Sequence, residues 1–100
     1  MTARIYDTLI ETAELAERLG DPDLVGLDCR HELARPECGA QAYAEAHIPG
    51  ALFAHLDRDL SGPVTAHTGR HPLPALDAFA RTAGDWGIDS PVQVVAYDQG

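Results

Sequence analysis

The stretch Tyr43-Ala44-Glu45-Ala46-His47-Ile48-Pro49-Gly50-Ala51 joins a helix-forming run to a tight turn and a strand. Residues 40–46 are rich in alanine, which favours a short helix. Pro49 and Gly50 break that helix and turn the chain. Ala51 permits close packing and begins an apolar run at 51–54. The stretch therefore predicts a helix, a turn and a short strand in succession.

Two further apolar runs predict strands. Residues 24–27 and 92–97 show little polar alternation, which is typical of strands that a parallel sheet buries on both faces. The run at 92–97 is the better candidate for the central strand, since it is the longer one and is rich in β-branched residues.

Two amphipathic stretches predict helices. The first covers residues 12–19 with Thr12 as its N-cap, or else begins at Thr8 with a capping box completed by Glu11. The second begins near Pro74 and ends before Gly87. Its apolar positions, which we expect to face the core, are Leu76, Phe79, Ala80, Ala83 and Trp86.

The alternation of strands and helices predicts an α/β fold. A chain of 100 residues builds at most one domain, and 45% apolar residues are enough for a core. We expect an open parallel sheet with helices on both faces. The long loop at 57–73 is rich in glycine and proline, and loops of this length often carry function.

The chain is acidic, with 7 Lys and Arg against 16 Asp and Glu and a net charge of −9. It has no means to build the basic face that nucleic acid or an anionic membrane requires, so we expect neither as a partner. Acidic residues interrupt the first twenty positions where a signal peptide would be apolar. Together with two cysteines, which we expect to stay reduced, this predicts a cytoplasmic protein.

Residues 43–51 resemble the signature of the rhodanese family, an aromatic residue followed after three residues by His, an aliphatic residue, Pro, Gly and Ala. Residues 20–30 resemble the opening strand of the same family. Residues 71–74, the helix around Phe79, residues 87–88 and residues 94–98 resemble the amino-terminal half of tandem thiosulfate or 3-mercaptopyruvate sulfurtransferases. The resemblance covers nearly the whole chain. It implies a rhodanese-like fold that stops after its central strand, with residues 1–100 as an amino-terminal, non-catalytic domain that is incomplete at its C-terminus.

In that family a Cys at the carboxyl end of the central strand attacks a sulfane sulfur and holds it as a persulfide. The matching position here is Asp98. A carboxylate cannot form a persulfide, and its charge opposes an anionic donor. The resemblance therefore implies that the chain has no catalytic residue of its own, needs no cofactor, and depends on a second rhodanese domain of the same protein to process a small anionic sulfur donor.

The resemblance also assigns roles to particular residues. Tyr97, His71 and His31 become candidates for the substrate pocket. We expect Asp28 and Arg30 to hold the edge of the sheet together and His47 to bond neighbouring loops. The positions of the structural signature are Asp28, Arg30, His47, Pro49, Gly50 and Ala51.

Cys29 is a rival nucleophile, because it follows a strand and Arg30 beside it can lower a thiol pKa. A buried, unreactive thiol is the commoner outcome for such a Cys. We expect Cys38 to be an exposed loop thiol without a role, and the paired acids Asp57 and Asp59 to form a solvated surface.

A zinc site is also disfavoured by spacing. Cys29, His31, Cys38 and His47 lack the paired ligands of a structural zinc unit. His67 and His71 are four residues apart, but Gly69 argues against the helix that would align them. We therefore expect no metal.

Two functions remain open on the sequence alone. The first is the amino-terminal part of a sulfurtransferase, and the alternative is a non-catalytic rhodanese-like module that binds or regulates a partner. Asp98 is compatible with both, and the sequence beyond Gly100 would separate them.

Overall fold

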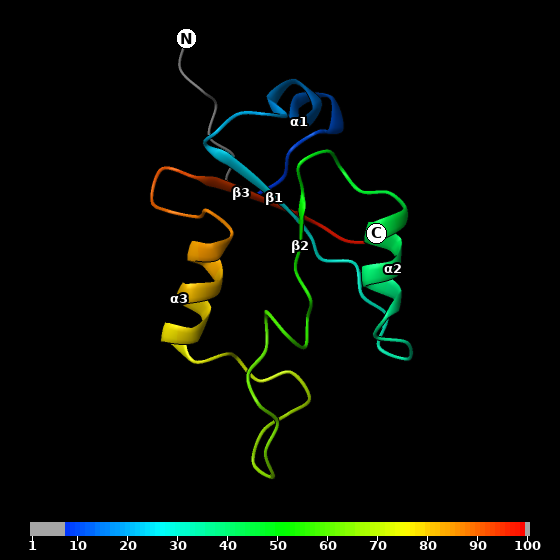
Figure 1. The fold of residues 1–100 in the computed structure, drawn as a ribbon, viewed down its shortest axis with the longest axis vertical. Coiled ribbons are helices and arrows are strands. Elements are labelled where there is room, and N and C mark those ends of the chain that lie inside the picture. The colour runs from blue at the N-terminus through cyan, green and yellow to red at the C-terminus, as the bar shows by residue number, and fades with distance from the viewer. Residues whose placement is uncertain (1–7, 100) are drawn as a thin grey trace.

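A computed structural model describes residues 8–99 of the chain. Within this range three helices and three strands alternate as the sequence predicts (Figure 1). Their bounds are α1 Thr12–Arg18, β1 Leu24–Asp28, α2 Cys38–Glu45, β2 Leu52–Phe53, α3 Leu76–Asp85 and β3 Gln93–Tyr97. Among the described residues no helix is long and apolar enough to cross a bilayer.

The three strands form an open parallel sheet in the order β2-β1-β3. β1 pairs with β3 along its whole length, from Leu24 opposite Gln93 to Asp28 opposite Tyr97. Figure 1 shows α3 on the opposite side of the strands from α1 and α2, so the predicted α/β class with helices on both faces is confirmed. The carboxyl ends of all three strands point to the same edge of the sheet, where ligands bind in such folds.

The prediction of a central strand at 92–97 is wrong for the described sheet. β1 lies in the middle and β3 at the edge. Burial alternates along β3 because successive side chains point to opposite faces of the sheet and one face is less covered, so Val94 stays 38% exposed. The sequence run looks continuous because its outward positions are also apolar, and periodicity alone cannot detect this.

The turn between α2 and β2 follows the sequence prediction closely. The Ala51 N–H donates to the Ile48 carbonyl at 2.9 Å, with Pro49 and Gly50 in the central positions. Gly50 has a φ of 79°, which identifies a type II turn and explains why glycine stands there. Ala51 is buried beside Gly26 of β1, and a Cβ at position 26 would lie 3.6 Å from the Ala51 Cβ.

The start of α1 differs from both predictions. The N-cap is Glu11, whose backbone is extended, and Thr12 is the first helical residue. The helix does not begin at Thr8, and no side chain caps it. The end of α1 agrees better with the prediction of a helix through Leu19. Leu19 is the C-cap, and Gly20 follows with a φ of 89°.

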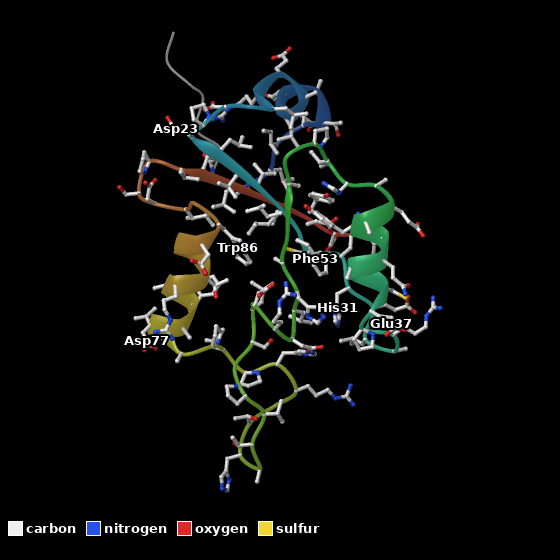
Figure 2. All side chains as sticks on the ribbon, viewed as in Figure 1. Asp23, His31, Glu37, Phe53, Asp77 and Trp86 are labelled. Carbon is white, nitrogen blue, oxygen red and sulfur yellow. The ribbon has the colours of Figure 1, made fainter. Side chains whose placement is uncertain are left out.

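The predicted core face of α3 is not buried among the described residues. Leu76 is 85% exposed and Phe79 is 37% exposed, while Trp86 is half-buried and points toward the sheet (Figure 2). The amphipathic pattern is real, but burial needs an opposing surface. Extensive contacts between elements join only the strands, and α3 touches its neighbours sparsely.

Candidate functional site

Asp28 organises the carboxyl end of β1. Its side chain is fully buried, although it carries a charge. The Arg30 guanidinium donates to both carboxylate oxygens, through Nε at 3.1 and 3.0 Å and through Nη2 at 2.7 Å to Oδ2. The Arg30 backbone N–H adds a bond to Oδ1 at 3.0 Å. Such multiple, charge-assisted bonds allow a carboxylate to remain inside the fold.

This network ties three segments to the Asp28 carboxylate. The Tyr97 hydroxyl donates to Asp28 Oδ2 at 3.1 Å and accepts from the Ile48 N–H at 3.1 Å. Arg30 Nη2 also donates to the Ala46 carbonyl at 2.6 Å. The end of β1, the end of β3 and the chain after α2 therefore meet at one buried charge.

Burial raises the pKa of Asp28, but the hydrogen bonds from Arg30 and Tyr97 outweigh it and hold the pKa below its usual value. A carboxyl with a lowered folded pKa stabilises the fold above its unfolded pKa, and that contribution is lost as the pH falls through the folded pKa. We expect the free energy of unfolding to drop below about pH 4, as urea titrations at a series of pH values would show.

Asp21 and Asp59 also have lowered pKa values and add to the same loss. The Asp28→Asn variant should therefore lose less stability between pH 5 and pH 3, about the range in which these carboxyls titrate, than the unchanged chain does. An identical acid dependence in the two proteins would show that Asp28 does not contribute.

Tyr43 and His47 form a second unit at the end of α2, where His47 bonds a helix carbonyl and not the neighbouring loops that were predicted. Their rings stack with centroids 3.8 Å apart, and the Tyr43 hydroxyl donates to the Ala51 carbonyl at 2.5 Å. His47 Nδ1 lies 2.7 Å from the Tyr43 carbonyl. Since a carbonyl only accepts, Nδ1 is the protonated nitrogen of the neutral ring.

His31 and His71, both substrate-pocket candidates, are neighbours in space. Their ring centroids lie 6.3 Å apart, although forty residues separate them in sequence. His71 Nε2 lies 3.0 Å from Asp57 Oδ1, which belongs to the turn that follows β2. The long loop after β2 therefore returns to the edge of the sheet, where it meets the segment that follows β1.

Tyr97, the third candidate, lies elsewhere. It lines a cavity of about 160 Å³ against α1, together with Leu15 and Pro49. His31 lines a separate cavity of about 420 Å³, together with Glu32. Residues of α2 also line this cavity. The Tyr97 hydroxyl is moreover engaged by Asp28 and Ile48.

The prediction of a solvated surface for the paired acids of the loop is wrong for Asp59 only, since the Asp57 side chain is 47% exposed. Asp57 pairs with His71, and the Asp59 side chain is only 14% exposed. Asp59 accepts from Arg58 at 2.9 Å and from the His55 N–H at 2.9 Å. Neither partner arrangement is visible in the sequence, because the loop must fold before these groups meet.

Asp98 is exposed at the end of β3, directly after Tyr97. Near it, the Cys29 thiol has a raised pKa, first through burial and then through the charges of Asp28 and Asp98. The idea that Arg30 lowers this pKa is therefore wrong. Arg30 is committed to Asp28, so Cys29 has the character of an inert thiol rather than a nucleophile.

Cys38 is not the exposed loop thiol that we predicted. It is half-buried and is the first residue of α2. Burial raises its pKa more than nearby Arg35 lowers it. Both cysteines are free thiols.

Two residues at this edge, Gln99 and His55, carry no signal in the sequence pattern. The side-chain amide of Gln99 makes two hydrogen bonds to the backbone of His31. The Gln99 amide nitrogen donates to the His31 carbonyl at 2.6 Å, and the Gln99 amide oxygen accepts from the His31 N–H at 3.2 Å. His55 lies edge-on to His31 with a centroid distance of 5.8 Å. Figure 2 shows His31 beneath α2, beside the chain that leaves β2.

Comparison with known proteins agrees with this architecture. The chain is 52% identical over 92% of its length to a probable 3-mercaptopyruvate sulfurtransferase of Pseudomonas aeruginosa. It is 44% identical over 90% of its length to a putative thiosulfate sulfurtransferase of Mycobacterium tuberculosis. The structure of a 3-mercaptopyruvate sulfurtransferase from Leishmania major superposes on 89% of the chain with a TM-score of 0.80 and 31% identity.

The chain spans only part of each relative. It covers 33% of the Pseudomonas protein, 32% of the Mycobacterium protein and 24% of the Leishmania chain. The profile of the rhodanese-like domain matches residues 11–100. The buried Asp28 network, the Pro49-Gly50 turn and this match lead to one conclusion: the chain belongs to the rhodanese-like domain family.

Proposed function

We propose that the chain is the amino-terminal, non-catalytic domain of a tandem sulfurtransferase. The whole protein would move a sulfane sulfur from thiosulfate or 3-mercaptopyruvate to a thiophilic acceptor such as cyanide or a thiol. The relatives that the chain matches bear the names of these two activities. It aligns with the amino-terminal part of them, about a third of their length, which leaves room for a second domain.

The observation that carries this proposal is the carboxylate at position 98, at the carboxyl end of β3. Sulfur transfer from thiosulfate requires a thiolate to attack the outer sulfur, with the S–S bond breaking and sulfite leaving with the electron pair. The resulting persulfide then passes its outer sulfur to the acceptor and regenerates the thiolate. Asp98 cannot do this, and Cys29 has a raised pKa. The nucleophile must then come from a second domain.

The role of this chain would be to supply a wall of the substrate site. His31 and His71 lie together at the edge of the sheet and are the residues we propose to face the donor. Tyr97 remains a candidate for contact through its ring, since its hydroxyl is bonded to Asp28. The guanidinium of Arg30 is also engaged, so the cations that bind an anionic donor would belong to the second domain.

We further propose a reducing compartment, the cytoplasm, as the location. Both Cys29 and Cys38 are free thiols in the fold. Unpaired thiols of this kind persist where glutathione and thioredoxin keep cysteines reduced.

The test compares the 100-residue chain with the full-length protein. We expect the chain to transfer no sulfur from thiosulfate or 3-mercaptopyruvate to cyanide above the uncatalysed rate, because it has no activated thiol. The full-length protein should turn over one of these donors, and a Cys→Ser change in its second half should abolish the activity. The readouts are thiocyanate from thiosulfate and pyruvate from 3-mercaptopyruvate.

The matched control is Cys29→Ser in the full-length protein, which should keep its activity. Turnover by the isolated chain, or loss of activity in the Cys29→Ser protein, would show that the nucleophile lies in this domain. A full-length protein that is inactive with both donors would favour the alternative of a non-catalytic binding module.

A further inference from the structure

Three ligand-bearing side chains from three separate segments converge at the carboxyl edge of the sheet. His31 follows β1, Asp57 follows β2, and His71 ends the long loop. One nitrogen or oxygen atom from each of them lies within 4.8 Å of the other two. Among residues 8–99 this is the one group of three or more His, Cys, Asp and Glu side chains that meets so closely.

His31 is held in place but lacks a complete set of partners. Its backbone N–H and carbonyl are both bonded to the Gln99 amide, which fixes the segment against the end of β3. Its ring nitrogen Nδ1 is buried and has no hydrogen-bond partner within the described chain. A buried polar atom without a hydrogen-bond partner lowers the stability of a fold by roughly 1 to 3 kcal/mol. The buried Nδ1 of His31 therefore needs an explanation.

The neighbouring His55 orients the cluster instead of joining it. Its Nδ1 accepts from the Asp57 N–H at 3.1 Å and from the Arg58 N–H at 3.3 Å. An accepting Nδ1 places the proton of the neutral ring on Nε2, which therefore has no lone pair for a metal. These bonds fix the backbone of Asp57 and so limit where its carboxylate can lie.

The distances suit a small cation. Two ligand atoms at about 2.1 Å from a zinc ion and at a tetrahedral angle are about 3.4 Å apart. His71 Nε2 and Asp57 Oδ1 are already 3.0 Å apart. With all three atoms within 4.8 Å, shifts of about 1 Å in the side chains complete the set.

We propose that His31, Asp57 and His71 form a binding site for a divalent transition-metal ion, with Zn²⁺ as the best match. Two imidazoles favour Zn²⁺, Ni²⁺ or Cu²⁺ over Mg²⁺ and Ca²⁺, which prefer oxygen ligands. The single carboxylate neutralises half of the ion's charge. Three protein ligands leave one tetrahedral position for water or a sulfur ligand.

Spacing along the sequence conceals this site. Spacing alone groups His31 with Cys29, Cys38 and His47, and His71 with His67, and predicts no metal for either set. The actual ligands are 26 and 14 residues apart, since the site depends on two loops folding toward the same strand ends. His31 and His71 are also the residues proposed to face the sulfur donor, but metal binding is measured without any sulfur transfer.

The experiment uses the whole chain without a histidine tag. Zn²⁺ binding is followed by equilibrium dialysis with metal analysis, and Co²⁺ binding by its visible absorption. We expect one ion per chain and a raised midpoint of thermal unfolding when Zn²⁺ is added. His31→Gln, Asp57→Asn and His71→Gln should each weaken the affinity by at least about 100-fold, because loss of an outer-sphere partner alone costs 10- to 100-fold.

Two matched controls separate this site from adventitious binding. His67→Gln removes an exposed histidine of the same loop and should leave the affinity unchanged. The double variant Cys29→Ser, Cys38→Ser should also bind normally and should show the same Co²⁺ spectrum. Binding that survives loss of His31 or His71, or that requires the thiols, would overturn the proposal, as would the absence of one-to-one binding.

Chemical modification of the unchanged chain tests the site even if the variants do not fold. Diethyl pyrocarbonate modifies imidazole nitrogens that are free, and mass spectrometry locates the modified residues. Zn²⁺ should protect His31 and His71 while His67 continues to react. Equal modification of all three residues in the presence of Zn²⁺ would contradict the site.

Discussion

Asp28→Ala should lower the free energy of unfolding by about 3 kcal/mol, the lower end of what is lost when one partner of a buried ion pair is removed. The change eliminates every acceptor for the Arg30 guanidinium except the Ala46 carbonyl and leaves the Tyr97 hydroxyl without its own acceptor. We choose the lower end because the Arg30 side chain is 24% exposed and can turn toward water, whereas Asp28 is fully buried.

Urea denaturation at pH 7 measures this loss. Asp21→Ala is a matched control, since Asp21 is also paired with an arginine, but its side chain is 27% exposed whereas that of Asp28 is fully buried. Loss of the Asp21 pair should therefore cost much less stability than loss of Asp28. Equal losses in the two variants would mean that the Asp28 network does not hold the strand ends together.

Gly39→Ala should cost about 2 kcal/mol. A Cβ at position 39 would lie 2.1 Å from the Arg30 carbonyl oxygen and 3.2 Å from the Phe53 ring. The first contact is with backbone and cannot be relieved by a side-chain rotation, so α2 must move away from the segment after β1. Overpacking of this kind costs about 1 to 3 kcal/mol or more, and the better helix propensity of alanine returns about 1 kcal/mol.

Gly84→Ala in α3 is the matched control, because it gains the helix propensity of alanine without the steric clash that a Cβ makes at position 39. Nothing lies within 4 Å of a Cβ at position 84, and its φ is not positive. This variant should be more stable than the unchanged chain by about 0.5 to 1 kcal/mol, so the two substitutions should act in opposite directions. A Gly39→Ala chain that is stabilised like the Gly84→Ala chain would show that α2 and the Arg30 segment are not in tight contact.

Local features of the fold were accessible from the sequence. The turn at Pro49 and Gly50 depends on residues that are adjacent in the chain, and the structure reproduces it with the positive φ that glycine allows. The α/β alternation was also recognised, since periodicity and breakers report on local structure. The start of α1 was misplaced, because Thr12 entered the helix and did not cap it.

Long-range features were accessible only in part. The amphipathic face of α3 was recognised, but the pattern cannot show whether a second surface covers it, and here Leu76 stays exposed. The roles of Asp28 and Arg30 were inferred from the family resemblance. Their geometry, and the raised pKa of Cys29 that follows from it, required the fold.

The sequence by itself determined the order of helices and strands and the place of the turn at Pro49 and Gly50. The carboxylate of Asp98 is likewise read from the sequence, and the family resemblance predicts a sulfur nucleophile at its position. The tertiary structure alone decided that β1 lies between β2 and β3, that Asp57 is a partner of His71, and that both meet His31. The reason is physical. Propensity and periodicity act between neighbours in the chain, whereas a site at the strand ends depends on how parallel strands align and where long loops return.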